Sequence, residues 1–374
     1  MLQQRAQYGQ QKAKEYHEGS YPMSILGFHL GLDPIDTYLG LNRECGFPAK
    51  VSSCEQSDQD AAAAALKSAR EDGILLDALA VYLLRRLEVM EAIEEEFGKI
   101  GVTQNTIDVS AKRTHDAETM GGYGEDGKKR SGHMSSQNGQ IVLSEMSEDE
   151  INAKVKLVRS DLDWLKASCE LIPAAAQVDP PNEIIRFRNE EGGRFFDDLF
   201  ACDGSNRILI SDDFHLRQWG SGLFKTRSAW IQALLFHLEE TQQISTEKVV
   251  KVTIQLLDAG EESLSVNSHR LQIGAEMLAN GELSEDEFQS LCGLIGQPGA
   301  GMGSHIKVAL ETIHGLWSTK SLIPVRQRVT SLLLRKLVRN QGENSRVVVD
   351  TIQTLARSRE VKDYIECWRI GHFT

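Results

Sequence analysis

The sequence predicts an α/β central domain with a mainly parallel sheet, flanked by an α-helical N-terminal segment and an α-helical C-terminal domain. Two short runs, ILL at 74–76 and RILIS at 207–211, end directly in aspartates, as expected for buried strands of a parallel sheet. Beyond about residue 225, apolar residues recur only at helical spacing. The 374 residues, 41% of them hydrophobic, are enough for two or three domains.

The elements follow in three segments, residues 1–70, 71–225 and 226–374. The first passes from a polar helical stretch through turns marked by Gly and Pro to the alanine-rich stretch 58–73, which is helical by propensity. In the second, FGKIGVT at 97–103 is a further short strand candidate. The third contains five amphipathic stretches joined by short polar links, and we assign it to an all-α domain.

Residues 112–140 are rich in Gly, Ser and charged side chains and contain almost no large apolar residue. This composition predicts an exposed, flexible loop within the central domain. Ser147 follows, with Glu150 three residues later. That spacing is a capping box and predicts that a helix begins there.

Composition excludes some classes of protein. The six cysteines are scattered without a C-x-x-C pair, so we expect reduced thiols and no structural zinc site. No apolar run approaches the ~20 residues of a membrane span, and the polar N-terminus has no signal-peptide core, so we expect a cytoplasmic protein without membrane contact. A net charge of −13 counts against nucleic-acid binding. Residues 320–346 are locally basic, and this strip is either a solvated helix face or a phosphate-tracking surface.

Aspartates follow both strand candidates. Asp77 ends the first run, Asp212 and Asp213 end the second, and Asp197 and Asp198 open the helix just before it. The carboxyl ends of parallel strands share one edge of the sheet, where functional groups collect. Carboxylates that converge there would repel one another and bind Mg²⁺ or Mn²⁺, which prefer oxygen ligands. Each acid also has a structural interpretation as a helix cap, a solvated first turn or a plain turn.

Three short motifs around these acids resemble the PIN family of nucleases. ILLDALAVY is similar to the family's opening strand, GRFFDDLFA to its later helix, and ILISDDFHLR to its closing strand with Thr/Ser-x-Asp. The resemblance spans about residues 20–225 and points to the PIN module of bacterial TPR/GreAB-C-PIN conflict-system proteins. It implies a PIN-like, Rossmannoid fold, with Asp77, Asp197 and Asp213 as catalytic metal ligands. Asp212 would be a further catalytic acid beside them, and Ser211 would steady the loop.

The sequence departs from the family at one position. PIN domains usually carry a glutamate in the helix after the second strand, where this chain has Val109. Asp108 is the nearest acid and is a further catalytic candidate. Either Asp108 substitutes for the glutamate, or an acid from elsewhere completes the site, or the site is partly degenerate. His215 and Arg217, which follow the last acids, are read as phosphate contacts or as structural residues.

The resemblance implies a metal-dependent endoribonuclease that uses Mg²⁺ or Mn²⁺ and leaves 5′-phosphate and 3′-hydroxyl ends. By analogy with the family, it would be a toxin or antiviral defence effector that cleaves RNA such as tRNA. Two alternatives stay open, namely a catalytically degenerate PIN-like scaffold that binds a protein partner, and a structure-specific DNA nuclease. The helical C-terminal domain is the expected site for a protein partner or regulator. The sequence also leaves open a homo-oligomer.

Overall fold

The computed structural model describes residues 2–41, 45–123, 129–137, 140–175, 179, 181–182, 184–185, 194–297 and 301–373. The chain divides into two compact units, Met1–Ser53 with Ser57–Gln243, and Cys54–Gln56 with Ile244–Thr374. The helical N-terminal segment and the α/β domain therefore form one unit. The division between the two units before the C-terminal helices lies at residues 243–244, whereas the sequence-based expectation placed a domain boundary at 225–226. Within the described ranges, every helix is too short or too polar to cross a membrane.

A five-stranded parallel sheet forms the centre of the first unit, in the order β7-β3-β2-β8-β9. The strands are β2 (Ile74–Leu76), β3 (Gly101–Val102), β7 (Glu170–Leu171), β8 (Ile208–Ile210) and β9 (Ser228–Ala229). Strands β2 and β8 consist of Ile and Leu that are buried throughout, since helices cover both faces of such a sheet. The α/β class and the parallel sheet agree with the sequence-based prediction.

The edge strand β9 corrects the expectation that only helices follow residue 225. Its two residues pair with β8, Leu209 with Ser228 and Ile210 with Ala229. A two-residue strand is too short to show an alternating pattern, so its identity depends on the partner strand and not on its own sequence.

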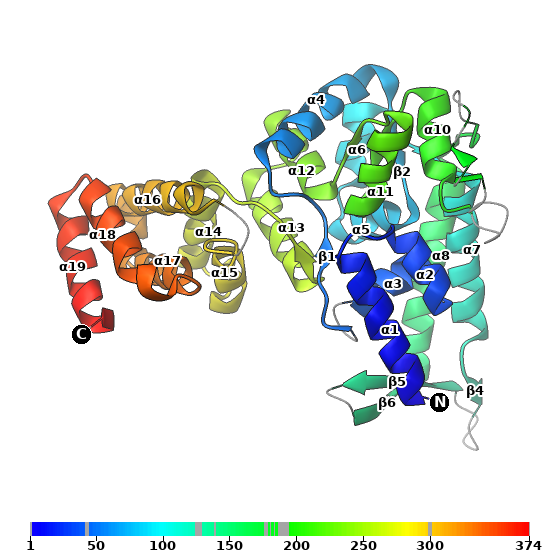
Figure 1. Cartoon of the computed structure of the whole chain (residues 1–374), viewed down its shortest axis with the longest axis horizontal. Helices are drawn as coiled ribbons and strands as arrows, with labels where there is room; N and C mark the ends of the chain where they lie inside the picture. Colours follow the sequence, from blue (N-terminus) through cyan, green and yellow to red (C-terminus); the bar gives the residue numbers. More distant parts are fainter. Residues whose placement is uncertain are drawn as a thin grey trace. The chain divides into compact units, whose positions relative to one another are not determined.

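Helices pack around this sheet (Figure 1). Helix α5 lies against β2 and also contacts α3, α7 and α8, while α10 contacts β2 and β8. The remaining helices and the short strand β1 of this unit have these bounds: α1 (Leu2–His17), α2 (Met23–Leu30), α3 (Pro34–Gly40), β1 (Ala49–Lys50), α4 (Gln56–Asp72), α5 (Ala78–Leu87), α6 (Met90–Phe97), α7 (Gln104–Thr119), α8 (Glu148–Ser168), α10 (Asp197–Ser205), α11 (Phe214–Trp219), a π-helical turn (Gly220–Phe224) and α12 (Ile231–Glu240).

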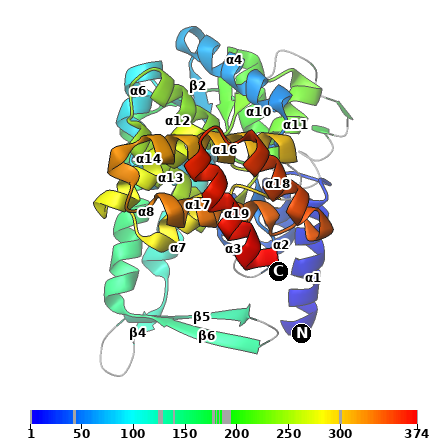
Figure 2. The same ribbon diagram turned by 90° about the vertical axis from the view of Figure 1, so that its left-hand side faces the viewer.

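The predicted loop at 112–140 was wrong for most of its described residues. Residues 112–119 continue α7, and the segment then forms an antiparallel sheet of β4 (Gly122–Tyr123), β5 (Lys129–Gln137) and β6 (Gln140–Met146). Residues 124–128 and 138–139 lie outside the described residues. Backbone pairing between β5 and β6 needs no apolar face, which explains why a polar composition was misread as a loop. This sheet lies at the end of α7 and α8 remote from β2 (Figures 1 and 2).

Helix α8 begins at the predicted capping box. The Ser147 hydroxyl accepts the Glu150 backbone N–H at 3.4 Å, and the Glu150 carboxylate accepts the Ser147 N–H at 2.7 Å. The two reciprocal bonds satisfy backbone donors that a helix leaves without an intrahelical partner.

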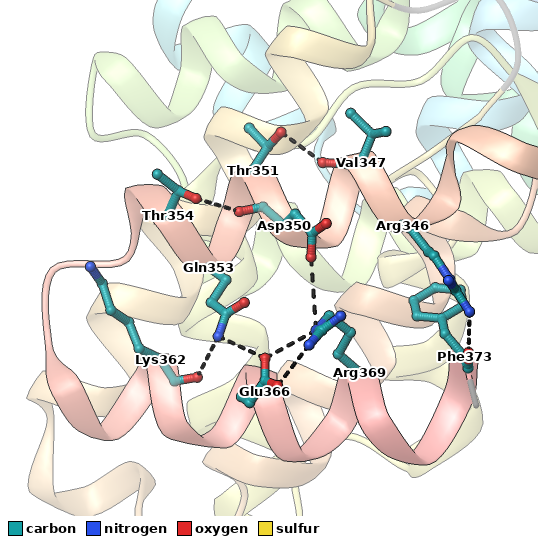
Figure 3. Close-up of polar contacts among 10 residues, drawn as sticks. All are labelled: Arg346, Val347, Asp350, Thr351, Gln353, Thr354, Lys362, Glu366, Arg369 and Phe373. Atoms are coloured by element: carbon teal, nitrogen blue, oxygen red, sulfur yellow. Dashed lines mark hydrogen bonds and ion pairs between the residues drawn. The ribbon is translucent and has the colours of Figure 1, made fainter.

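The second unit is helical except for the short strand β10. Its elements are α13 (Thr246–Asp258), β10 (Glu261–Glu262), α14 (Ser268–Asn280), α15 (Glu285–Cys292), α16 (Met302–Ser318), a 3₁₀ turn (Lys320–Leu322), α17 (Arg326–Val338), a second 3₁₀ turn (Gly342–Asn344), α18 (Ser345–Leu355) and α19 (Arg359–Phe373). Figure 3 shows how polar side chains join α18 to α19. Arg369 pairs with Glu366 at 2.7 Å and lies 3.8 Å from Asp350 on the neighbouring helix.

Candidate active site

The carboxyl ends of β2 and β8 meet at one edge of the sheet. Leu76 pairs with Ile210, and the Asp77 backbone N–H donates to the Ile210 carbonyl at 3.4 Å. Asp77 therefore lies beside the Ser211–Asp212–Asp213 loop, and all three aspartates are buried. The prediction that acids from the two strands share this edge is confirmed.

Asp77 caps a helix and also faces other acids. Its Oδ1 accepts the Ala80 backbone N–H at 2.6 Å, so it is the N-cap of α5. Burial, followed by the negative charge of Asp198, raises the pKa of Asp77 to about 8. The charge of Asp213 raises it further, while a hydrogen bond from Ser211 lowers it. The Asp77 side chain therefore both caps α5 and belongs to the acidic cluster.

The pair Asp197–Asp198 opens α10, and both side chains are buried. Asp198 Oδ1 accepts the Thr103 hydroxyl at 2.7 Å. Burial raises the pKa of Asp198 to about 7, the hydrogen bond from Thr103 opposes this increase, and the charge of Asp197 adds to it. A solvated first turn is excluded by this burial. Asp198 interacts electrostatically with Asp77, so it joins the candidate set beside Asp197.

Asp213 accepts hydrogen bonds on both carboxylate oxygens. Oδ1 caps α11 by accepting the His215 and Leu216 backbone N–H groups at 3.1 and 3.3 Å. Oδ2 accepts the backbone N–H of Met23, the first residue of α2, at 2.5 Å. Burial raises the pKa of Asp213 to about 6, and these N–H groups oppose the increase.

Ser211 and Asp212 hold the loop between β8 and α11. The Ser211 hydroxyl accepts the Asp213 backbone N–H at 3.1 Å, as the expected steadying role of Ser211 requires. Asp212 is fully buried, and its Oδ1 accepts the Ile231 backbone N–H at 2.7 Å. Ile231 is the first residue of α12. Asp212 therefore accepts a backbone N–H at the start of α12, which has no partner within that helix.

Asp108 does not lie in the buried group. Its side chain on α7 is 52% exposed and pairs with Arg194 at 2.5 Å. It also accepts a hydrogen bond from the Gln104 side chain at 2.8 Å, one turn earlier in the helix. The sequence placed Asp108 in the correct helix, but its contacts are those of a surface ion pair.

His215 and Arg217 point into the protein. Burial lowers the pKa of His215 to about 4, and its ring packs edge-on against Tyr16 with centroids 5.1 Å apart. The buried Arg217 donates to the Val51 carbonyl, and its guanidinium lies 5.0 Å from the Trp230 ring centroid. Its charge interacts with Asp58, Asp212, Asp213 and Asp77. Arg217 therefore acts as an internal counter-charge and not as a surface phosphate contact.

The oxygen atoms of these side chains are of the type that divalent cations prefer, but they are not arranged as a complete metal site. Buried carboxylates with raised pKa values, at Asp77, Asp198 and Asp213, are relieved by a cation and are the ligands that Mg²⁺ and Mn²⁺ prefer. Among the residues that the structure describes, however, no group of three or more His, Cys, Asp or Glu is arranged to hold a metal ion. The described acids therefore supply a suitable donor set without a three-ligand cage.

Two partners of the acids escaped the sequence-based interpretation. Thr103 directly follows β3, which is a weak signal because many N-caps are threonines. Met23 carries no signal, since only its backbone N–H takes part. Both contacts join parts of the chain that are far apart in sequence.

The part of the chain that contains this edge of the sheet is similar to a known protein family. Residues 75–222 match the PIN domain associated with the TPR-GreAB-C-PIN system. The match includes the candidate acids Asp77, Asp108, Asp197, Asp198, Asp212 and Asp213. No curated protein and no solved structure matches the chain.

Proposed function

Because residues 75–222 form a PIN domain of the TPR-GreAB-C-PIN family, we propose that this protein is a divalent-metal-dependent endoribonuclease. Domains of this kind are generally nucleases. The observation that carries the proposal is the burial of Asp77, Asp197, Asp198 and Asp213 at one edge of the sheet. Acids kept in such an environment destabilise a fold and are expected where they serve a reaction.

The proposed ligands of Mg²⁺ or Mn²⁺ are Asp77, Asp197 and Asp213, with Asp198 beside them. When bound, a divalent cation would lower the pKa of water and offset the charge that develops on the phosphodiester oxygens. Asp77 is anchored by Ala80 and Asp213 by three backbone N–H groups, so both carboxylates are held in fixed orientations. Asp212 supports the loop through Ile231. We assign Asp108 no part in the reaction.

The substrate and biological role are proposed by analogy with the family. RNA, with tRNA as the first candidate, would be cut to leave 5′-phosphate and 3′-hydroxyl ends by a toxin or defence effector. Exposed Arg194, three residues before the acidic pair, is a cation of the described chain that could meet a phosphate. The helical second unit is proposed to bind a protein partner or regulator.

One observation favours a non-catalytic alternative. Each of Asp77, Asp198, Asp212 and Asp213 already accepts a hydrogen bond, and the described acids form no three-ligand group. A degenerate PIN domain that serves as a binding scaffold would show these features too. Cleavage separates the two functions, because only the nuclease requires the carboxylate charges.

The test is a cleavage assay of the full chain on total tRNA with Mn²⁺ or Mg²⁺. We expect the wild type to cut and Asp77→Asn and Asp213→Asn each to lose at least about 100-fold in rate, as is typical when an essential group is removed. Asp363→Asn is the matched control, since its side chain on α19 is 69% exposed. The proposal is contradicted if the wild type does not cut, or if either site variant cuts as fast as the wild type. Cleavage of branched DNA instead of RNA would identify a structure-specific DNA nuclease.

A further inference from the structure

Thr103 makes a buried connection that neither its helix nor its strand requires. Its hydroxyl oxygen accepts the Thr106 backbone N–H at 3.4 Å, as the N-cap of α7. The same hydroxyl donates to Asp198 Oδ1 at 2.7 Å. A hydroxyl can do both because it has one donor and two acceptor positions. The bond to the carboxylate is the shorter of the two and is the stronger type if Asp198 is ionised.

The Thr103–Asp198 bond spans the edge of the sheet at its centre. Thr103 directly follows β3, and Asp198 is the second residue of α10. Strand β2 lies between β3 and β8 in the sheet and ends in Asp77. Helix α10 contacts both β2 and β8. The Thr103 hydroxyl therefore holds Asp198 from the β3 side of β2, whereas the Asp212–Asp213 loop follows β8 on the other side of β2.

Asp198 needs such an anchor because its charge opposes that of its neighbours. Asp77 and Asp197 both interact with it unfavourably when ionised. A free aspartate at the start of a helix would turn toward its own backbone N–H groups or toward water. Here the side chain is buried and is held by a residue 95 positions earlier in the chain.

We propose that Thr103 is a positioning residue that holds the Asp198 carboxylate beside Asp77, so that Asp198 acts as a further ligand in the nuclease site. This inference rests on the proposed nuclease function. It assigns a working role to the second aspartate of the Asp197–Asp198 pair. It also gives the first residue after β3 a function besides helix capping.

The test compares Thr103→Val with Thr103→Ser in the full chain. Valine keeps the branched shape and removes the hydroxyl, whereas serine keeps the hydroxyl. We measure Mn²⁺ binding by isothermal titration calorimetry and tRNA cleavage in parallel. Thr103→Val should weaken Mn²⁺ binding by about 10-fold or more, as expected when a group that orients a ligand is removed. Thr103→Ser should restore it.

Two controls separate positioning from capping. Ser147→Ala removes an N-cap hydroxyl from α8 and should leave Mn²⁺ binding unchanged at a similar cost in stability, about 1 kcal/mol. Asp198→Asn keeps the Thr103 cap and should weaken binding by itself. The double variant Thr103→Val/Asp198→Asn should bind no more weakly than Asp198→Asn, because the two residues act through one contact.

The outcomes distinguish the two proposals. If the wild type binds Mn²⁺ and cuts tRNA but folded Thr103→Val behaves like wild type, the positioning role is wrong and the nuclease stands. If Thr103→Val does not fold, Asp198→Asn decides, and wild-type Mn²⁺ affinity in that variant overturns the inference. If the wild type neither binds Mn²⁺ nor cuts, both proposals are overturned.

Discussion

Ionisation of the individual carboxyl groups at the sheet edge is unfavourable, because these groups are buried. Burial raises the pKa of Asp77 to about 8, that of Asp198 to about 7 and that of Asp213 to about 6. Arg217 offsets part of this charge from inside the protein, yet its own pKa is lowered by the same burial. Proteins retain such unfavourable groups mainly where function depends on them, and replacing them commonly stabilises the fold.

The raised pKa of Asp77 predicts a specific pH dependence of stability. An unfolded aspartate titrates near 3.9, so between about pH 4 and pH 8 the folded protein binds more protons at Asp77 than the unfolded chain does. The free energy of unfolding therefore falls as the pH rises through this window. Asp77→Asn keeps an oxygen for the Ala80 N–H and removes the titration. Its stability relative to wild type should increase by at least about 1.4 kcal/mol from pH 5 to pH 8, the value of a tenfold change in proton affinity.

This difference is measured by urea denaturation of both proteins at pH 5 and pH 8 in the presence of a chelator. Asp363→Asn, on the exposed face of α19, provides the control and should differ from wild type equally at both pH values. A constant difference for Asp77→Asn would show that Asp77 is ionised in the fold at pH 5. The pKa assignment would then be wrong.

At the level of elements, helix N-termini converge on the acids. Asp77 caps α5 and Asp213 caps α11, while Asp212 and Asp213 also accept N–H groups from the starts of α12 and α2. The partial positive charge at each helix start favours ionised carboxylates and opposes the effect of burial. The N-terminal segment is thus part of the environment of the site, although it lies outside the matched range 75–222.

The contact between α2 and Asp213 predicts the effect of Met23→Pro. Proline fits as the first helical residue, and Pro22 before it has the extended conformation that a following proline requires (φ −64°, ψ 161°). The substitution removes the N–H that Asp213 accepts at 2.5 Å. Relative to Met23→Leu, which keeps that N–H and most of the buried side chain, it should lower the free energy of unfolding at pH 8. Loss of the donor to Asp213 contributes about 1–3 kcal/mol, and truncation of the buried Met23 side chain adds a part that does not depend on pH.

The deficit of Met23→Pro should shrink below pH 6, because protonated Asp213 depends less on backbone donors. Thermal or urea denaturation of the two variants at pH 5 and pH 8 gives the comparison. A difference between the proline and leucine variants that is the same at both pH values would mean that the Met23 N–H contributes nothing to holding Asp213.

The elements also show where sequence-based prediction succeeds. Strands β2 and β8 were recognisable because three consecutive apolar residues are buried on both faces and end in acids. Strands β7 and β9 have two residues each, and only pairing with β3 and β8 defines them. The acids could be located in the same way, since they end strands or begin helices. Thr103 and the Met23 N–H could not, because their roles arise from contacts with residues 95 and 190 positions away.

For the whole molecule, two compact units predict two separable responses to core mutation. Leu333 on α17 is fully buried within the second unit. Leu333→Ala should destabilise that unit by about 2–5 kcal/mol, as for other buried leucines. Differential scanning calorimetry should show that one transition shifts and that the transition sensitive to Asp77→Asn does not. A single transition that shifts as a whole would show that the units unfold together.

The order of the strands has a consequence for the protein during its own synthesis. Strand β2 pairs with β3 on one side and with β8 on the other, and Ile74 is opposite Ile208. Asp77 therefore leaves the ribosome long before the strand that brings Asp213 to it. At ~5–20 residues per second, the interval is on the order of ten seconds. Through that interval the nascent chain contains Asp77 but not yet Asp197, Asp198, Asp212 or Asp213. The nuclease proposed above would therefore be unable to cut the messenger RNA that encodes it until its sheet is closed.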